Sequence, residues 1–104
     1  MNIKIIHRTY EKEKYYEIDT DKNYFKVNGK TKDADIETVA FISGALISTW
    51  PEHLEKENVY DGNECKILLK DEGEKRSCTF INKMPENFSQ LIDCLEDTES
   101  KQNI

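Results

Sequence analysis

The chain has 104 residues, of which 37% are hydrophobic and 35% are charged, and its formal net charge at pH 7 is −6. This length and composition predict one globular domain that folds without metal ions or disulfide bonds. The acidic balance disfavours direct binding of nucleic acid, which depends on lysine and arginine contacts with phosphates. Residues 51–104 carry thirteen acidic and seven basic side chains, whereas residues 1–50 carry eight of each. An acidic surface of this kind can steer a basic partner from a distance.

Three features of the sequence predict a cytoplasmic protein that does not contact a membrane. No apolar run approaches the roughly 18 residues of a membrane-spanning helix. Residues 1–10 lack the basic start, apolar stretch and small-residue cleavage site of a signal peptide. Three cysteines, an odd number, fit a reducing compartment in which thiols remain free.

The N-terminal part of the chain predicts two or three antiparallel strands. Side chains in residues 1–9 and 14–20 alternate in character, and residues 24–28 are rich in aromatic and β-branched side chains. The dipeptide Asn28-Gly29 favours a tight turn because both residues tolerate positive φ. We therefore expect neighbouring strands joined by short turns.

Residues 35–50 predict one helix, because their apolar side chains recur at helical spacing. Asp33 or Asp35 suits the N-cap, and Pro51 ends the helix because the residue before a proline is disfavoured in the helical region. The apolar stripe consists of Ile36, Val39, Ala40, Leu46, Ile47 and Trp50.

The same helix is apolar on more than one side. Beyond the stripe, Phe41, Ile42 and Ala45 extend the apolar character around the cylinder. Since a helix that is hydrophobic all round is normally buried, we expect this one to be central and packed on more than one side.

The second half of the chain predicts a hairpin followed by a helix. Residues 52–60 form a polar link, with room for one helical turn, and segments 63–70 and 75–82 are the strands of the hairpin. Residues 85–87 open an amphipathic helix whose apolar side chains recur at i, i+3, i+4 and i+7. These side chains are Phe88, Leu91, Ile92 and Leu95.

Together these elements predict a single α+β domain over residues 1–97 and a frayed C-terminal tail over residues 98–104. Its expected architecture is an antiparallel sheet of about five strands with two helices packed on one face, in the order β-β-β-α-β-β-α.

Two cysteines in the hairpin raise the question of thiol chemistry. Cys65 shares one strand face with apolar residues, and Cys78 shares another with Phe80. Placing both apolar sets on one side of the sheet pairs Lys70 with Lys75, through a two-residue turn or a four-residue loop. The cysteines are then diagonal neighbours about 7–8 Å apart, beyond comfortable disulfide reach. We therefore expect them to be reduced and to fill the core.

No spacing in the sequence selects a metal, cofactor or catalytic site. His7 and His53 are isolated, Cys94 lies beside the apolar stripe of the last helix, and close Cys-x-x-Cys or His pairs are absent from the sequence. On a surface with 21 carboxylates, acid–base pairs arise by chance. We expect a protein that is not an enzyme and binds no cofactor.

Part of the sequence resembles a pattern of small bacterial proteins. Trp50, "YDGNEC" at 60–65, a hairpin and "MPENFSQLI" at 84–92 carry the likeness, which covers roughly residues 50–95. Those proteins often have an aromatic residue shortly after Asp-Gly, where this chain has Cys65, and the pattern implies no activity. In its size and acidity the chain is also similar to immunity proteins of bacterial toxin systems, including those of contact-dependent growth inhibition.

The likeness to immunity proteins implies a binding function. An acidic inhibitor can imitate nucleic acid, associate quickly with a basic toxin nuclease and cover its active site. We therefore expect a monomeric, acidic protein that neutralises a basic protein partner. The expected partner-binding residues are Trp50, Glu52, Glu55, Glu57, Asp61, Glu64, Asp93, Glu96, Asp97 and Glu99. Trp50 suits an interface anchor or a buried helix end. An alternative is a regulatory or adaptor module that binds a protein or peptide through a sheet edge.

Overall fold

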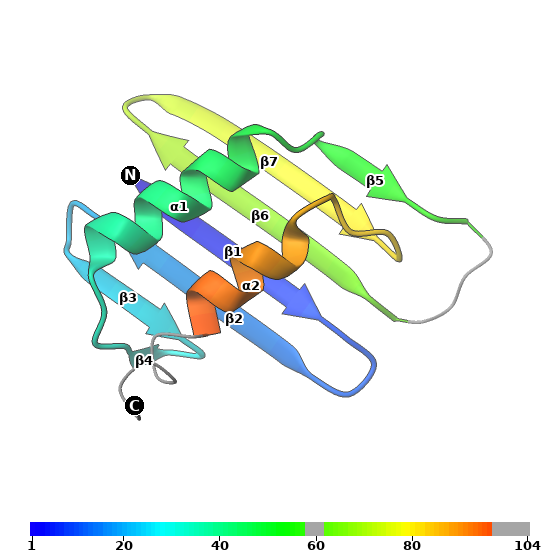
Figure 1. Cartoon of the computed structure of the whole chain (residues 1–104), viewed down its shortest axis with the longest axis horizontal. Coiled ribbons are helices and arrows are strands. Elements are labelled where there is room, and N and C mark those ends of the chain that lie inside the picture. The colour runs from blue at the N-terminus through cyan, green and yellow to red at the C-terminus, as the bar shows by residue number, and fades with distance from the viewer. Residues whose placement is uncertain (58–61, 97–104) are drawn as a thin grey trace.

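The computed structural model describes residues 1–57 and 62–96, which form one sheet of seven strands with two helices on one face (Figure 1). The elements are β1 (Asn2–Arg8), β2 (Glu13–Asp19), β3 (Tyr24–Val27), β4 (Lys30–Thr31), α1 (Ile36–Ser48), β5 (His53–Glu55), β6 (Glu64–Asp71), β7 (Glu74–Ile81) and α2 (Phe88–Glu96). The α+β class and the placement of both helices on one face agree with the sequence analysis. The predicted tail, residues 98–104, lies outside the described residues.

The sheet is mixed and has more strands than the five predicted. Its order is β4-β3-β2-β1-β6-β7-β5, and β5 runs parallel to β7 while the other neighbours are antiparallel. β5 occupies part of the segment expected to be a polar link. Thr79 N donates to Glu52 O (2.8 Å) and Lys56 N donates to Ile81 O (3.0 Å), so the strand is held by its neighbour. A strand of three residues, with only Leu54 apolar, has too few positions to show a period, so the sequence did not predict it.

The β6–β7 hairpin has the register that the parity of its side chains predicts. Cys65 pairs with Phe80, Ile67 with Cys78 and Lys70 with Lys75. Glu72 and Gly73 form the two-residue turn, with φ of 47° and 84°. The predicted Asn28-Gly29 turn is also present, between β3 and β4, with φ of 53° and 82°. Both turns have the positive φ pair that suits the right-handed twist of a hairpin.

α1 begins after Asp35, the second of the two cap residues that the sequence offers. Asp35 is the N-cap, and its Oδ1 accepts a hydrogen bond from Thr38 N (3.3 Å). The helix ends at Ser48, two residues before the predicted end. It buries Val39, Ala40, Ser43 and Ile47 against the sheet and α2.

The expectation that α1 packs on more than one side is wrong. The side chain of Phe41 is 76% exposed, that of Ile42 is 40% exposed, and Ala45 is also exposed. The physical reason lies in the architecture, because a two-layer fold covers only the sheet-facing side of each helix. An apolar helix surface is thus left open to solvent.

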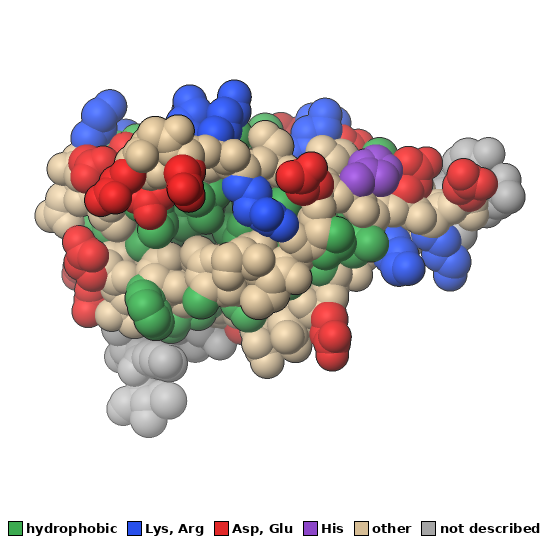
Figure 2. Space-filling model, turned by 90° about the horizontal axis from the view of Figure 1, so that it is seen from above, with side chains coloured by type: hydrophobic (Ala, Val, Ile, Leu, Met, Phe, Trp, Pro, Cys, Tyr) green, Lys and Arg blue, Asp and Glu red, His purple; other side chains and the backbone are tan. Residues whose placement is uncertain are grey.

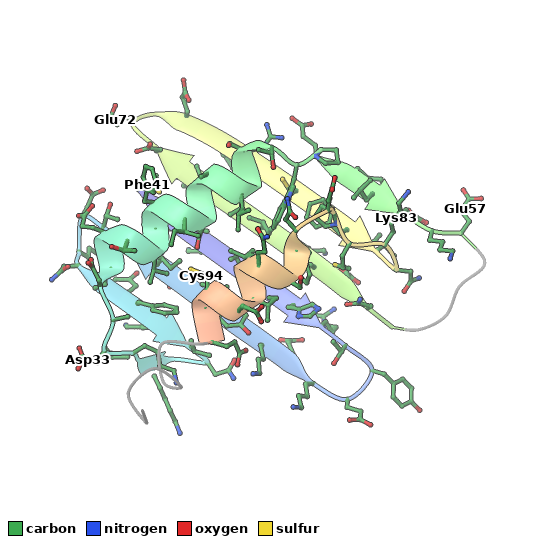
Figure 3. All side chains as sticks on the ribbon, in the orientation of Figure 1. Asp33, Phe41, Glu57, Glu72, Lys83 and Cys94 are labelled. Carbon is green, nitrogen blue, oxygen red and sulfur yellow. The ribbon has the colours of Figure 1, made fainter. Side chains whose placement is uncertain are left out.

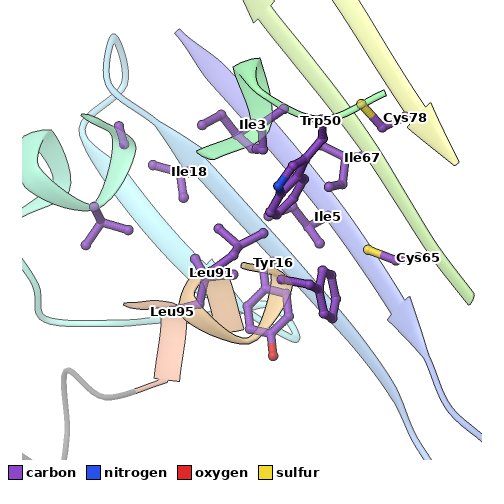
Figure 4. Packing of buried hydrophobic residues seen from close by; sticks show 14 of the residues in the cluster. Ile3, Ile5, Tyr16, Ile18, Trp50, Cys65, Ile67, Cys78, Leu91 and Leu95 are labelled. Atoms are coloured by element: carbon purple, nitrogen blue, oxygen red, sulfur yellow. The ribbon is translucent and has the colours of Figure 1, made fainter. Parts of the chain in front are cut away.

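The core lies between the sheet and the two helices (Figure 4). Alternate residues of the central strands and one face of each helix supply its side chains. The largest fully buried ones are Tyr16, Phe25, Phe80, Ile3, Ile5, Ile18, Ile47, Leu91 and Leu95. Neither described helix is long and apolar enough to cross a membrane.

Candidate protein-binding surface

The hairpin cysteines belong to the core. Cys65 and Cys78 are 0% and 1% exposed, and neither forms a disulfide (Figure 4). Burial raises the pKa of the Cys65 thiol to about 12, and it also raises the pKa of Cys78. A thiol that stays protonated is a poor nucleophile and a poor metal ligand. Within the described residues, no three His, Cys, Asp or Glu side chains gather as a metal site.

The acidic residues predicted to bind a partner do not form one surface. Glu52 precedes β5, Glu55 lies in β5 and Glu57 follows it, at the β5 edge of the sheet. Glu64 begins β6, whereas Asp93 and Glu96 lie on α2, which covers the face of β1 and β2 (Figure 1). Three further predicted residues, Asp61, Asp97 and Glu99, lie outside the described residues.

Two of the predicted residues hold the fold together instead. Trp50 is only 3% exposed, and its Nε1 donates to Glu86 O (2.9 Å). It is a buried helix-end residue and not an accessible anchor. Glu96 Oε1 accepts hydrogen bonds from Lys14 Nζ (2.7 Å) and the Tyr16 hydroxyl. Burial raises the pKa of Glu96, but these hydrogen bonds outweigh it, so the pKa is lowered overall.

A groove lies between α1 and the tip of the β6–β7 hairpin, and among the described residues predicted to bind a partner only Glu52 lines it. The groove has two lobes of about 400 Å³ and 530 Å³, which share Met1 and Asp71. Figure 2 shows acidic side chains gathered at this end of the molecule, beside a band of hydrophobic side chains. We call this surface the acidic groove. It is lined by Met1, Thr20, Asp21, Glu37, Ala40, Phe41, Gly44, Ser48, Glu52, Leu69, Asp71, Glu72, Glu74, Lys75 and Arg76.

Negative charge is densest in the smaller lobe. Asp21, Glu37, Asp71 and Glu72 line it from four separate elements or turns. The amino group of Met1 lies among them, 3.2 Å from Asp21 Oδ2. The amino group also lies 4.0 Å from Asp71 Oδ1, so it offsets part of the negative charge. The four carboxylates still outnumber it, and the resulting negative potential attracts lysine and arginine side chains.

The larger lobe contains positive charge as well. Arg76 and Lys75 line it together with Glu52 and Glu74. Arg76 Nη2 donates to the carbonyl oxygen of Trp50 and thereby ties β7 to the end of α1. The groove therefore changes along its length from acidic to mixed charge, which would orient a bound segment.

Apolar side chains border the acidic lobe. Phe41 is the most exposed large apolar side chain of α1, and Figure 3 shows it on the side of the helix nearest the turn that holds Glu72. In contrast, Glu57 lies at the opposite end of the molecule (Figure 3). An exposed aromatic ring beside a charged rim is the arrangement typical of a protein interface.

The backbone of Glu72 adds a further observation. Its φ of 47° lies in the left-handed region, where a side chain other than that of Asn, Asp or Gly is unusual. Such a conformation costs about 1 kcal/mol or more. A glutamate at this position therefore lowers the stability of the fold. Its carboxylate lies at the rim of the groove.

Both edges of the sheet are short. β4 has two residues and β5 has three, so a strand added beside either would form a short ladder of hydrogen bonds.

The sequence signal for the groove was partial. Asp71–Glu74 was recognisable as a charged turn, and Phe41 as an apolar residue outside the main helical stripe. Their proximity to Asp21 and Glu37 depends on tertiary packing. No family model matches the chain, and neither a curated protein nor a solved structure matches it. The chemistry of the groove therefore carries the functional argument.

Proposed function

We propose that this protein is a non-enzymatic acidic binding protein that neutralises a basic protein partner through the acidic groove. The observation that carries the proposal is the joint presence of four carboxylates and an exposed aromatic side chain around one cavity. The carboxylates supply attraction for a basic surface, and Phe41 supplies apolar area that is desolvated on contact.

We further propose that the partner is a toxin nuclease and that the protein acts as its immunity protein, in the cytoplasm. Nuclease toxins are commonly basic because they must hold nucleic acid. An acidic groove that receives basic side chains from the nucleic-acid site would block substrate entry by steric and electrostatic occlusion. The size and acidity of the chain support this class.

The electrostatic part of the mechanism mainly affects the rate of association. Complementary charges raise association rate constants, and their effect falls steeply as salt screens them. The apolar contact made by Phe41 mainly affects dissociation. The proposal thus expects a complex whose association rate depends strongly on salt and whose lifetime depends on Phe41.

The proposal predicts that the gene immediately upstream of this one encodes a protein with a basic C-terminal domain, and the test uses that domain. Co-expression of the present chain should restore growth to cells that express that domain. Phe41→Ser and Glu72→Lys should each weaken binding at least tenfold in surface plasmon resonance. Asp93→Lys reverses a charge on the exposed side of α2 and serves as the matched control, which should bind like the parent protein.

Two results would count against the proposal. Toxicity that persists during co-expression would contradict the proposed immunity function. Loss of binding in Asp93→Lys, with Glu72→Lys unaffected, would place the interface on α2 and not in the groove.

The sheet-edge alternative makes a distinct prediction. It expects an extended peptide to bind in a salt-insensitive manner, because backbone hydrogen bonds would supply the affinity. The short edges at β4 and β5 offer this alternative less support than the groove offers the first proposal.

A further inference from the structure

One face of the sheet has no helix over it. α1 and α2 both lie on the other face, as the ribbon shows (Figure 1). An antiparallel sheet with one solvated face normally alternates apolar and polar side chains along each strand. On the central strands this alternation fails at Ile6, Tyr15 and Leu68, whose side chains belong to the open face and are only half-buried.

These apolar side chains line a depression of about 500 Å³ that is rimmed by lysines. Lys4, Lys66 and Lys75 border it, and Lys70 lies on the same face of β6. Its lining also includes Ser77 and Thr79, but no carboxylate. We call this surface the lysine face.

The four lysines differ in how far acidic neighbours offset their charge. Within residues 1–57 and 62–96, Lys4, Lys70 and Lys75 form no salt bridge, and Lys66 forms one to Glu64 at 3.5 Å. Glu17 of β2 lies on the same side of the sheet, paired with Lys4, and it offsets the charge of that lysine. The hydrogen bond from Tyr24 Oη (2.6 Å) is the main cause that lowers the pKa of Glu17, and Lys4 lowers it further, so the carboxylate stays charged. The positive charge of the lysine face therefore lies mainly at Lys70 and Lys75, with a partly balanced contribution from Lys66, beside an apolar floor.

Such a surface fits a partner that is acidic at its rim and carries an exposed apolar side chain. The acidic groove of this chain has both properties, through the carboxylates of its smaller lobe and through Phe41. We propose that the lysine face of one copy binds the acidic groove of a second copy, so that the protein self-associates head to tail. The sequence by itself gives the expectation of a monomer.

The geometry determines what kind of assembly results. The two surfaces differ and share only Lys75 in their linings, so the interface is heterologous and each bound copy keeps one free surface. Copies should add one after another and not stop at a symmetric dimer. The association should weaken in salt, because the charges lie at solvent-exposed rims.

Self-association would also regulate access to the groove, a consequence that rests on the proposed function. A basic partner and a second copy would compete for the same carboxylates. Partner binding should therefore dissociate the assemblies into complexes.

The test is sedimentation velocity at low salt over a wide range of protein concentration. The parent chain should form species that grow beyond a dimer with concentration and dissociate in salt. The variant Lys66→Glu/Lys70→Glu removes the lysine face, and Glu37→Lys/Glu72→Lys removes the acidic groove. Each should be monomeric alone. Lys75 stays unchanged because it borders both surfaces.

The decisive sample is an equimolar mixture of the two variants. Each supplies one intact surface, so the mixture should form dimers and nothing larger. Lys12→Glu/Lys83→Glu carries the same change in charge at two exposed positions outside both surfaces, and it should assemble like the parent chain. Circular dichroism of every variant separates a lost interface from a lost fold.

Several outcomes would overturn the inference. They are a parent chain that is monomeric at all concentrations, a parent chain that stops at a dimer, and a variant mixture that stays monomeric. The lysine-face variant should still bind the basic partner of the proposed function. If the parent chain does not self-associate, the proposed function is unaffected. If the basic partner does not bind, sedimentation alone still decides whether the chain self-associates.

Discussion

Cys65 lies on β6 opposite the ring of Phe80, with none of its surface exposed. Its role as core packing predicts that size and polarity matter more than the sulfur. Cys65→Ala should cost about 1–2 kcal/mol of unfolding free energy, through lost apolar contact and a small cavity. Cys65→Ser should lower the unfolding free energy by about 1–3 kcal/mol more than Cys65→Ala does, because it buries a hydroxyl group that lacks a hydrogen-bond partner. Urea denaturation of the two variants measures the difference.

The control for this prediction is thiol labelling of the folded parent protein. Cys65 and Cys78 should remain unmodified until the chain unfolds, because burial raises the pKa of both thiols. Rapid modification of Cys65 in the native state would contradict its assignment to the core.

Glu72 has a left-handed backbone conformation that a glutamate side chain disfavours. Glu72→Asn should stabilise the fold by up to about 1 kcal/mol, because asparagine accepts the left-handed conformation more readily. Thermal unfolding measures this gain. Glu74→Asn is the matched control, since Glu74 lies in the extended strand β7, and it should give no comparable gain. A Glu72→Asn variant that is less stable than the parent would show that the side chain, and not the backbone, dominates at this position.

At the scale of elements, α2 is fastened to β2 through Glu96. Lys14 and the Tyr16 hydroxyl both donate to its Oε1, and Leu91 and Leu95 are buried beneath the helix. A double-mutant cycle with Tyr16→Phe and Glu96→Gln should give a coupling energy of about 1–2 kcal/mol. A coupling near zero would mean that the hydrogen bond adds nothing to the docking of α2.

The same contact predicts a pH dependence with a definite sign. The pKa of Glu96 is lowered in the folded state, so its contribution is present above the ordinary glutamate value and is lost as the pH falls through the lowered one. The stability advantage of the parent over Glu96→Gln should therefore shrink below about pH 4. Urea midpoints at neutral and acidic pH measure this change, and an advantage that grows in acid would contradict the assignment.

The elements also differ in how far local sequence predicts them. β6, β7 and α2 follow from strong alternation or helical spacing, and the hairpin register follows from the parity of Cys65 and Cys78. β5 was not predictable in this way, because three residues, two of them polar, become a strand only when the backbone of β7 offers hydrogen bonds. The exposure of Phe41 was mispredicted because helical spacing shows that a side is apolar, not that another element covers it.

At the scale of the whole molecule, Trp50 connects α1 with the rest of the core. Its ring packs edge-on against Phe80, with centroids 5.8 Å apart, and lies 6.1 Å from the ring of Phe88. It is the single tryptophan of the chain, so its fluorescence reports on the junction of α1, β7 and α2. Because the described residues share one core, unfolding followed by this fluorescence and by far-ultraviolet circular dichroism should have the same midpoint. Separate midpoints would show that the helices detach before the sheet unfolds.

The sequence by itself determined the α+β class, the Asn28-Gly29 turn, the pairing of Lys70 with Lys75 and the inward direction of the hairpin cysteines. It narrowed the helix cap to Asp33 or Asp35 and the hairpin connection to two lengths, and the structure selects Asp35 and the Glu72-Gly73 turn. These features depend on neighbours along the chain, where spacing and backbone preference act directly. Only the tertiary structure decided that Trp50 and Glu96 serve the fold, that Phe41 faces solvent, and that Asp21, Glu37, Asp71 and Glu72 surround one groove. Charge and apolar character can be read residue by residue, but their convergence into a surface depends on which distant elements pack together.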